Sequence, residues 1–209
     1  TDVSEALRVP GVRAVLTGED CAILAGEEIR DRPIIARDRV RYYGEIVAVA
    51  VADTEAQAQR AASLVKLRYE PLPTVQSPLQ ALHADAPILH ERLAEYEKGE
   101  GVVSVPGTNI ASVIHVRKGD LDIGWRESET IVENFVSFLP SDHAAMETRC
   151  ATAEIKPDGH IVIETSTQAP FAVKKHMSRY FGVDAGWIVV RAPLVGAGYG
   201  GKAAIQLEL

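Results

Sequence analysis

Cysteine is nearly absent from this sequence of 209 residues, which has only Cys21 and Cys150. The two lie far apart, and neither belongs to a CxxC pair. Iron–sulfur clusters are held by groups of cysteine thiolates, so this chain does not carry such a cluster itself. The low cysteine content also excludes a disulfide framework. It predicts a reducing, cytoplasmic compartment in which both thiols are buried and inert.

Long apolar runs and basic clusters are missing as well. A membrane-spanning helix needs about 18–20 consecutive apolar residues, and no run in the sequence is that long. Residues 1–5 lack the basic and apolar regions of a signal peptide. The net charge is −7, without a cluster of Lys and Arg, and binding to duplex nucleic acid requires such clusters. We therefore expect a globular protein with no membrane span and no nucleic-acid partner.

The hydrophobic content of 46% is sufficient for a core, and the length allows one large domain or two small ones. Residues 46–52 form a continuous apolar run, which predicts a strand buried on both faces. Thr54 and Gln57 have the spacing of a capping box, and alanines at helical spacing predict a helix over 54–65. Residues 66–69 are predicted to form a short strand after this helix. A strand, a helix and a second strand in succession indicate an α/β layer.

Residues 70–112 contain many prolines and read as a linker between two units. The second unit begins near residue 113 and mixes strands with one helix. A Pro-Asp-Gly turn at 157–159 predicts a hairpin. The expected elements are a strand at 130–139, hairpin strands at 149–156 and 160–167, a helix from Pro170 to Gly182, and a strand at 187–190.

A glycine-rich heptad, GAGYGGK at residues 196–202, can be interpreted in three ways. It matches the GxGxxG dinucleotide fingerprint, but the acidic residue required about 20 positions later falls beyond the end of the chain. It matches most of a P-loop with Lys202 at a phosphate, but Ala203 stands where a Ser or Thr should hold Mg²⁺. A third interpretation is a tight turn that places backbone amides against a cofactor.

Two further segments bear on this choice. Gln168 lies between a predicted strand and a predicted helix, and its amide can donate and accept hydrogen bonds. It could meet a cofactor, or simply cap the helix. His143 and Glu147 lack the HExxH pattern of a zinc site, so structural hydrogen bonds are their expected role.

Six short segments follow one another along the chain: PGVRAVLT at 10–17, VRYYGE at 40–45, YEPLP at 69–73, HAAME at 143–147, STQAP at 166–170, and the glycine heptad. Each motif is weak alone, and the ordered set spans nearly the whole chain. Taken in order, they resemble the molybdenum-binding large subunit of the xanthine dehydrogenase/aldehyde oxidase family.

The resemblance implies a mixed α+β fold in three parts. Residues 1–80 would form a small a/b hammerhead domain that lacks its first strand. Residues 81–112 would be an inter-domain linker. Residues 113–209 would be the N-terminal part of a truncated molybdopterin-binding domain. The sequence has no initiator Met and ends within an apparent element, which predicts a fragment of a longer polypeptide.

The family's cofactor site maps onto Gln168, Gly198, Tyr199, Gly200 and Gly201. By resemblance, Gln168 hydrogen-bonds a ligand of molybdenum, and the glycines bring backbone amides close to it. Tyr199 replaces the more common Phe.

The resemblance implies an oxidoreductase that uses water to oxidise a purine-like N-heterocycle or an aldehyde. Its cofactor is molybdenum–molybdopterin, in a form that could be the cytosine dinucleotide. Partner subunits or domains with 2Fe-2S clusters and FAD would complete a hetero-oligomer. The family's catalytic Glu base would lie beyond Leu209, and Ala203 stands where purine-oxidising members often have a substrate-binding Glu, which weakens xanthine as the substrate. The alternatives are a nucleotide-binding enzyme that uses Lys202 and a non-enzymatic assembly module.

The purified 209-residue chain should therefore show no turnover of N-heterocycles or aldehydes, because part of the cofactor site lies outside it. A steady-state assay with an artificial electron acceptor checks this expectation. Turnover by the isolated chain would contradict it.

Overall fold

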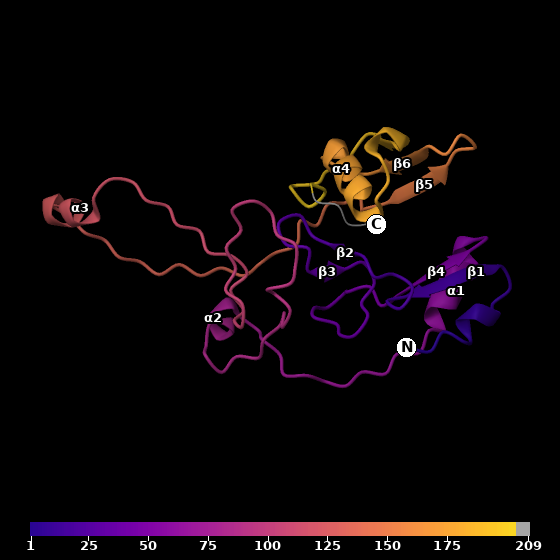
Figure 1. Ribbon diagram of the computed structural model, residues 1–209, viewed down its shortest axis with the longest axis horizontal. Helices are drawn as coiled ribbons and strands as arrows, with labels where there is room; N and C mark the ends of the chain where they lie inside the picture. The colour runs from indigo at the N-terminus through magenta and orange to yellow at the C-terminus, as the bar shows by residue number, and fades with distance from the viewer. Residues whose placement is uncertain (204–209) are drawn as a thin grey trace.

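The computed structural model describes residues 1–203 and combines helices with three small sheets in that range. The mixed α and β composition expected from the sequence is confirmed (Figure 1). Short 3-10 helices occur at Ala6–Arg8 and Ala185–Trp187. The strands are β1 (Val12–Thr17), β2 (Leu24–Ala25), β3 (Arg32–Pro33), β4 (Ala48–Ala52), β5 (Ala151–Ile155), β6 (Ile161–Thr165) and β7 (Ile188–Arg191), and the helices are α1 (Glu55–Ser63), α2 (Pro78–Ala81), α3 (Leu121–Glu127) and α4 (Pro170–Phe181).

The N-terminal unit pairs β1 antiparallel with β4 and packs α1 against them. Its core contains Ala6, Val15 and Ala61. Thr54 is confirmed as the N-cap of α1, since its hydroxyl accepts a hydrogen bond from the Gln57 amide at 3.4 Å. The Gln57 side chain accepts from the Thr54 hydroxyl at 3.0 Å and not from the Thr54 amide, so the reciprocal bond of a capping box is not formed.

Two predictions for this unit are wrong. β4 is not buried on both faces, and its residues alternate between half-buried and exposed, because β1 is its only partner strand in the described part of the chain. Residues 66–69 do not form a strand. Only Lys66 pairs, in an isolated bridge with Asp2, so the apolar side chains after it have no sheet to join.

The hairpin of β2 and β3 packs against α4, although the two are more than a hundred residues apart in sequence. Ala25, Val173 and Tyr180 form the buried cluster between them. The Tyr180 hydroxyl donates to the Gly26 carbonyl at 2.8 Å and accepts from the Gly26 amide at 3.1 Å. This contact joins the N-terminal part of the chain to the C-terminal sheet.

The C-terminal sheet has the order β5-β6-β7, with β5 antiparallel and β7 parallel to β6. The predicted hairpin, the helix from Pro170 and the following strand are confirmed. Gly182 ends α4 with φ of 65°, a left-handed conformation that costs glycine little. Ile163 and Ile188 are fully buried in this unit.

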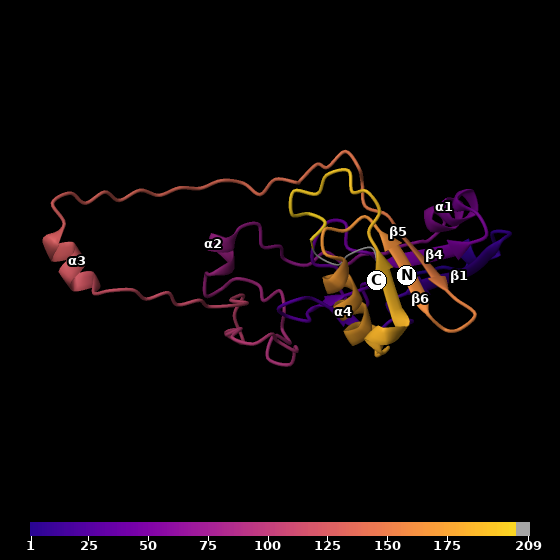
Figure 2. The ribbon, with the colours of Figure 1, turned by 90° about the horizontal axis from the view of Figure 1, so that it is seen from above.

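Residues 114–139, here called the arm, extend away from the rest of the molecule and hold only α3 (Figure 2). The predicted strand at 130–139 is wrong, because no described segment lies beside it to accept its hydrogen bonds.

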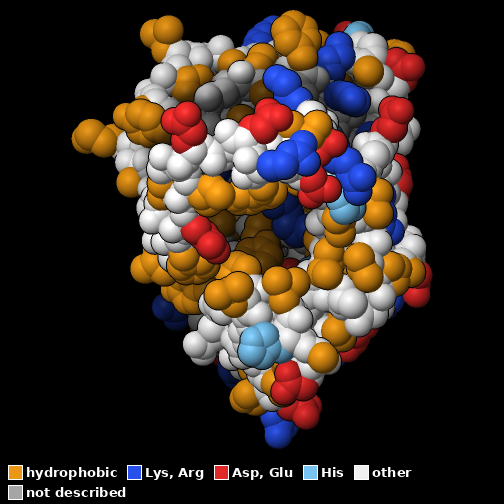
Figure 3. All heavy atoms as spheres, turned by 90° about the vertical axis from the view of Figure 1, so that its left-hand side faces the viewer, with side chains coloured by type: hydrophobic (Ala, Val, Ile, Leu, Met, Phe, Trp, Pro, Cys, Tyr) orange, Lys and Arg blue, Asp and Glu red, His pale blue; other side chains and the backbone are white. Residues whose placement is uncertain are grey.

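Seen from the end where α3 lies, hydrophobic side chains gather around a central hollow (Figure 3). Exposed apolar residues of the arm are Ile114, Val116, Leu121, Ile123, Trp125, Ile131, Val132, Phe135, Val136, Phe138 and Leu139.

The expectation of two buried thiols is also wrong. Cys150 is exposed and Cys21 is half-buried, and both are free. Cys150 directly precedes the outer strand β5, where nothing described covers it. No helix in residues 1–203 is long and apolar enough to cross a membrane.

Replacing Tyr180 with Phe should destabilise the chain by about 1–3 kcal/mol, since it removes two hydrogen bonds and leaves the half-buried amide and carbonyl of Gly26 unpaired. Urea unfolding measures the change. The control Tyr69→Phe, at an exposed position, should stay within about 0.5 kcal/mol of the parent chain. Equal stabilities for the two variants would contradict the role of this contact.

Candidate functional site

The glycine heptad at 196–202 follows β7 and adopts a conformation that most residues avoid. Ala197 has φ of 81°, Tyr199 of 52° and Gly200 of 90°. A left-handed conformation costs a residue with a Cβ about 1–2 kcal/mol. The surrounding contacts must therefore hold the loop in place, and such strain is typical of functional sites.

Gln168 holds the end of the loop. Its side-chain Oε1 accepts hydrogen bonds from the amides of Gly200 at 3.1 Å and Lys202 at 3.2 Å. Its backbone amide donates to the Lys202 carbonyl at 2.9 Å. Two N–H donors identify the acceptor as the amide oxygen. The Nε2 donors of Gln168 consequently have no partner among residues 1–203 and remain available to a ligand.

Glu147 connects the two ends of the loop. Its Oε2 accepts from the Lys202 ammonium at 2.9 Å and from the Gly196 amide. Lys202 is buried, with 3% of its surface exposed. The Lys202 hydrogen bond is the main cause that lowers the pKa of Glu147 below its usual value, and burial opposes it. The carboxylate is thus held in its charged form.

Two more side chains bind loop carbonyls. Arg149 donates to the Gly201 carbonyl, and the Thr167 hydroxyl donates to the Lys202 carbonyl at 3.2 Å. A Cβ at Gly198 would lie 2.3 Å from the Gln168 oxygen, and a Cβ at Gly201 would lie 2.8 Å from the His143 ring. Only glycine fits at these two positions without displacing a neighbour.

The loop leaves three consecutive amides without a partner in the described part of the chain. They belong to Ala197, Gly198 and Tyr199. Successive amides in turns with left-handed residues form a concave site for anions and oxygen acceptors. Together with the Gln168 donors, they suit a ligand that carries several oxygen atoms.

The structure brings together all five cofactor-binding residues predicted from sequence: Gln168, Gly198, Tyr199, Gly200 and Gly201. The Tyr199 side chain is 74% exposed beside the amides. Their contacts with a cofactor stay a prediction.

Other predictions for the site can be compared with the structure. The structural hydrogen bonds expected of Glu147 are present. The alternative role of Lys202 at a nucleotide phosphate does not fit, because its ammonium is buried against Glu147.

Sequence reasoning missed the part that Arg149 and Thr167 play. Both are ordinary polar residues, and they lie 52 and 35 residues from their partners. No spacing pattern connects residues over such distances. Only the expectation that the start of β5 and the end of β6 lie beside the glycine loop could have indicated these two roles. In residues 1–203, no group of three or more His, Cys, Asp or Glu side chains could hold a metal ion.

Fold and site together define a cofactor-binding unit of mixed α and β structure. The family model of the "molybdopterin cofactor-binding domain" matches residues 103–209, and that of the "aldehyde oxidase and xanthine dehydrogenase, a/b hammerhead domain" matches residues 1–73. The chain therefore belongs to the xanthine dehydrogenase and aldehyde oxidase family and forms part of its molybdopterin-binding subunit.

Among individual relatives, the chain is 29% identical to the probable hypoxanthine oxidase XdhD of Escherichia coli K12, over 99% of this chain and 25% of that protein. It is 31% identical to the xanthine dehydrogenase/oxidase of Rattus norvegicus, over 96% of this chain and 14% of that protein. It also resembles the crystal structure of quinoline 2-oxidoreductase from Pseudomonas putida 86, with a TM-score of 0.78 and 29% identity over 96% of this chain and 25% of that one. The chain thus spans a quarter or less of these relatives.

Replacing Glu147 with Gln should lower stability at neutral pH, because the charged partner of Lys202 is lost. The pKa of Glu147 is depressed in the folded chain. Its stabilising effect is therefore complete above the usual Glu value of about 4.3 and is lost as the pH falls through the folded pKa. The stability difference between the parent chain and E147Q should therefore shrink as the pH falls below about 4.3 and through the lowered pKa of Glu147.

Urea midpoints measured across this pH range test the prediction. The arm variant Glu133→Gln is the matched control and should follow the parent chain at every pH. A constant difference between E147Q and the parent chain would show that the charge of Glu147 does not hold the loop.

Proposed function

We propose that this chain provides one wall of a molybdenum–molybdopterin site in an oxidoreductase that hydroxylates an N-heterocycle or an aldehyde, with water as the oxygen source. The observation that carries the proposal is the binding of the Gln168 oxygen to the loop amides at 3.1 and 3.2 Å. This binding turns the other end of the Gln168 amide outward as a hydrogen-bond donor. When bound, the molybdenum cofactor supplies the two-electron redox chemistry.

The residues of the chain bind and orient the cofactor. Gln168 donates from Nε2 to an acceptor atom on the cofactor, and the amides of Gly198 and Tyr199 donate to neighbouring oxygen atoms. Donors fixed before the reaction stabilise developing negative charge without a cost of reorganisation. Gly200 and Gly201 let the backbone approach closely.

The substrate class rests on the relatives and on one residue. The names of the relatives include a probable hypoxanthine oxidase, a nicotinate dehydrogenase large molybdopterin subunit and a quinoline 2-oxidoreductase. All three names refer to nitrogen heterocycles. Ala203 is exposed beside the loop and offers no charged group to a purine, which favours a heterocycle other than xanthine.

The remaining parts of the enzyme are proposed as follows. Partner subunits or domains carry the 2Fe-2S clusters and FAD, in a cytoplasmic hetero-oligomer, and the pterin is the cytosine dinucleotide form. The catalytic Glu lies outside residues 1–209. The hammerhead domain covers 1–80, the linker 81–112 and the molybdopterin-binding part 113–209, with support from the family matches to residues 1–73 and 103–209.

The test uses the complete enzyme that contains this chain, purified with its partners. Mass spectrometry of metals should find bound molybdenum, and oxygen from ¹⁸O-labelled water should enter the product. Replacing Gln168 with Ala should lower kcat by about 10²–10³-fold, the usual loss when a preorganised donor is removed. The control Gln59→Ala, on α1 and bonded only to Glu55, should keep full activity.

A second readout is independent of activity. In Q168A the amides of Gly200 and Lys202 lose their acceptor, so their hydrogen exchange should speed up by about tenfold. Purified enzyme without molybdenum, or Q168A with unchanged kcat, would overturn the proposal.

A further inference from the structure

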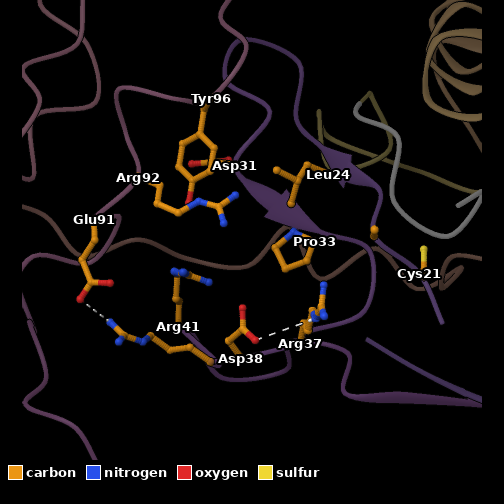
Figure 4. Close-up of a pocket in the computed structure, with 12 residues that line it drawn as sticks. Cys21, Leu24, Asp31, Pro33, Arg37, Asp38, Arg41, Glu91, Arg92 and Tyr96 are labelled. Carbon is orange, nitrogen blue, oxygen red and sulfur yellow. Dashed lines mark hydrogen bonds and ion pairs between the residues drawn. The ribbon is translucent and has the colours of Figure 1, made fainter. Parts of the chain in front are cut away.

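A pocket of about 230 Å³ lies between the β2–β3 hairpin and the segment around residues 91–96 (Figure 4). None of its lining residues belongs to the glycine loop or to the residues that hold it. Although the chain has a net charge of −7, the pocket has more cations than anions. Its charged residues are Arg37, Arg39, Arg41 and Arg92 against Asp31, Asp38 and Glu91.

Two of the arginines, Arg37 and Arg39, pair with carboxylates that themselves line the pocket. Arg39 pairs with Glu91 at 3.0 Å, and Arg37 lies 4.0 Å from Asp38 and 3.2 Å from Glu19 outside the pocket. These pairs offset the charges of Glu91 and Asp38. Arg92 is paired as well, with Glu95 outside the pocket, whereas Arg41 has no ion pair in the described part of the chain. Arg41 and the terminal nitrogens of Arg92 are therefore the groups left for a ligand.

The guanidinium groups of Arg41 and Arg92 both extend into the central space of the pocket (Figure 4). Arg41 donates from Nε to the Leu89 carbonyl at 3.0 Å, and Arg92 pairs through Nε with Glu95 at 3.2 Å. Both contacts are made through Nε. The terminal nitrogens of both have no partner in the described part of the chain, and they are the atoms that bind a carboxylate in two-pronged geometry.

The other side of the pocket is apolar. Leu24 and Pro33 contribute to it, and the ring of Tyr96 lies near Arg92 and Asp31 (Figure 4). A ligand that meets both surfaces needs an oxyanion at one end and a flat apolar body at the other. We propose that the pocket binds a small organic carboxylate, with Arg41 and Arg92 as its anchors and Tyr96 against its body. This site is separate from the glycine loop and does not depend on the function proposed above.

Asp31 allows a test of whether the bound ligand is negatively charged. Its carboxylate also lines the pocket, and its nearest basic group is His90 at 3.8 Å. Burial lowers the pKa of His90, so it offers little positive charge at neutral pH. Asp31 therefore repels a bound carboxylate, and replacing it with Asn should strengthen binding.

The experiment is calorimetric titration of the full 209-residue chain at pH 7.5 with benzoate, benzamide and inorganic phosphate. Benzoate should bind at least tenfold more tightly than benzamide, which has the same ring without the charge, and more tightly than phosphate, which lacks the apolar body. The double variant Arg41→Gln/Arg92→Gln should weaken benzoate binding at least tenfold. Asp31→Asn should tighten it several-fold.

The control Arg13→Gln removes a surface arginine that pairs with Asp53, and it should leave the benzoate affinity unchanged. If the double variant does not fold, NMR titration of the parent chain replaces it, and shifts should be confined to residues near 21–41 and 89–96. Equal binding of benzamide, equal or tighter binding of phosphate, shifts at the glycine loop, or no binding at millimolar benzoate would each overturn the proposal.

Discussion

The hydrogen bonds from the loop amides of Gly200 and Lys202 to the Gln168 oxygen are the interaction on which the site depends. They hold a turn that contains two non-glycine residues in left-handed conformation. Glu147 completes the arrangement, since it binds Gly196 at one end of the loop and the buried ammonium of Lys202 at the other. The strain of the loop is offset by these charged and neutral hydrogen bonds, which leave the amides of Ala197, Gly198 and Tyr199 without a partner among residues 1–203.

The position of Gln168 depends in turn on α4, which begins two residues later and packs on the β2–β3 hairpin. Tyr180 bonds to Gly26 across this contact. Glu97 adds an ionic connection, because it binds Arg30 at 2.7 Å and also contacts Arg179 on α4. These two arginines, Arg179 first, lower the pKa of Glu97. The hairpin and the linker thereby brace the helix that follows the site.

Elements governed by neighbouring residues were predicted correctly. The N-cap at Thr54, the turn at 157–159 and the left-handed Gly182 each depend on chemistry within a few positions. Elements that need a partner far away in the sequence were predicted wrongly. The segments 66–69 and 130–139 have strand-forming residues, but a strand exists only where another chain segment accepts its hydrogen bonds. The exposure of Cys150 likewise depends on what covers β5, which no local pattern records.

The sequence by itself determined the family, the mixed α and β composition, and the five residues at the candidate cofactor site, because motifs in a fixed order and glycines in a turn are local features. Only the tertiary structure decided how these residues act. It assigned the Gln168 oxygen to the loop, which leaves its Nε2 without a partner among residues 1–203, and it buried Lys202 against Glu147. These outcomes require atoms more than thirty residues apart to meet within hydrogen-bond distance, and packing, not sequence spacing, sets which atoms meet.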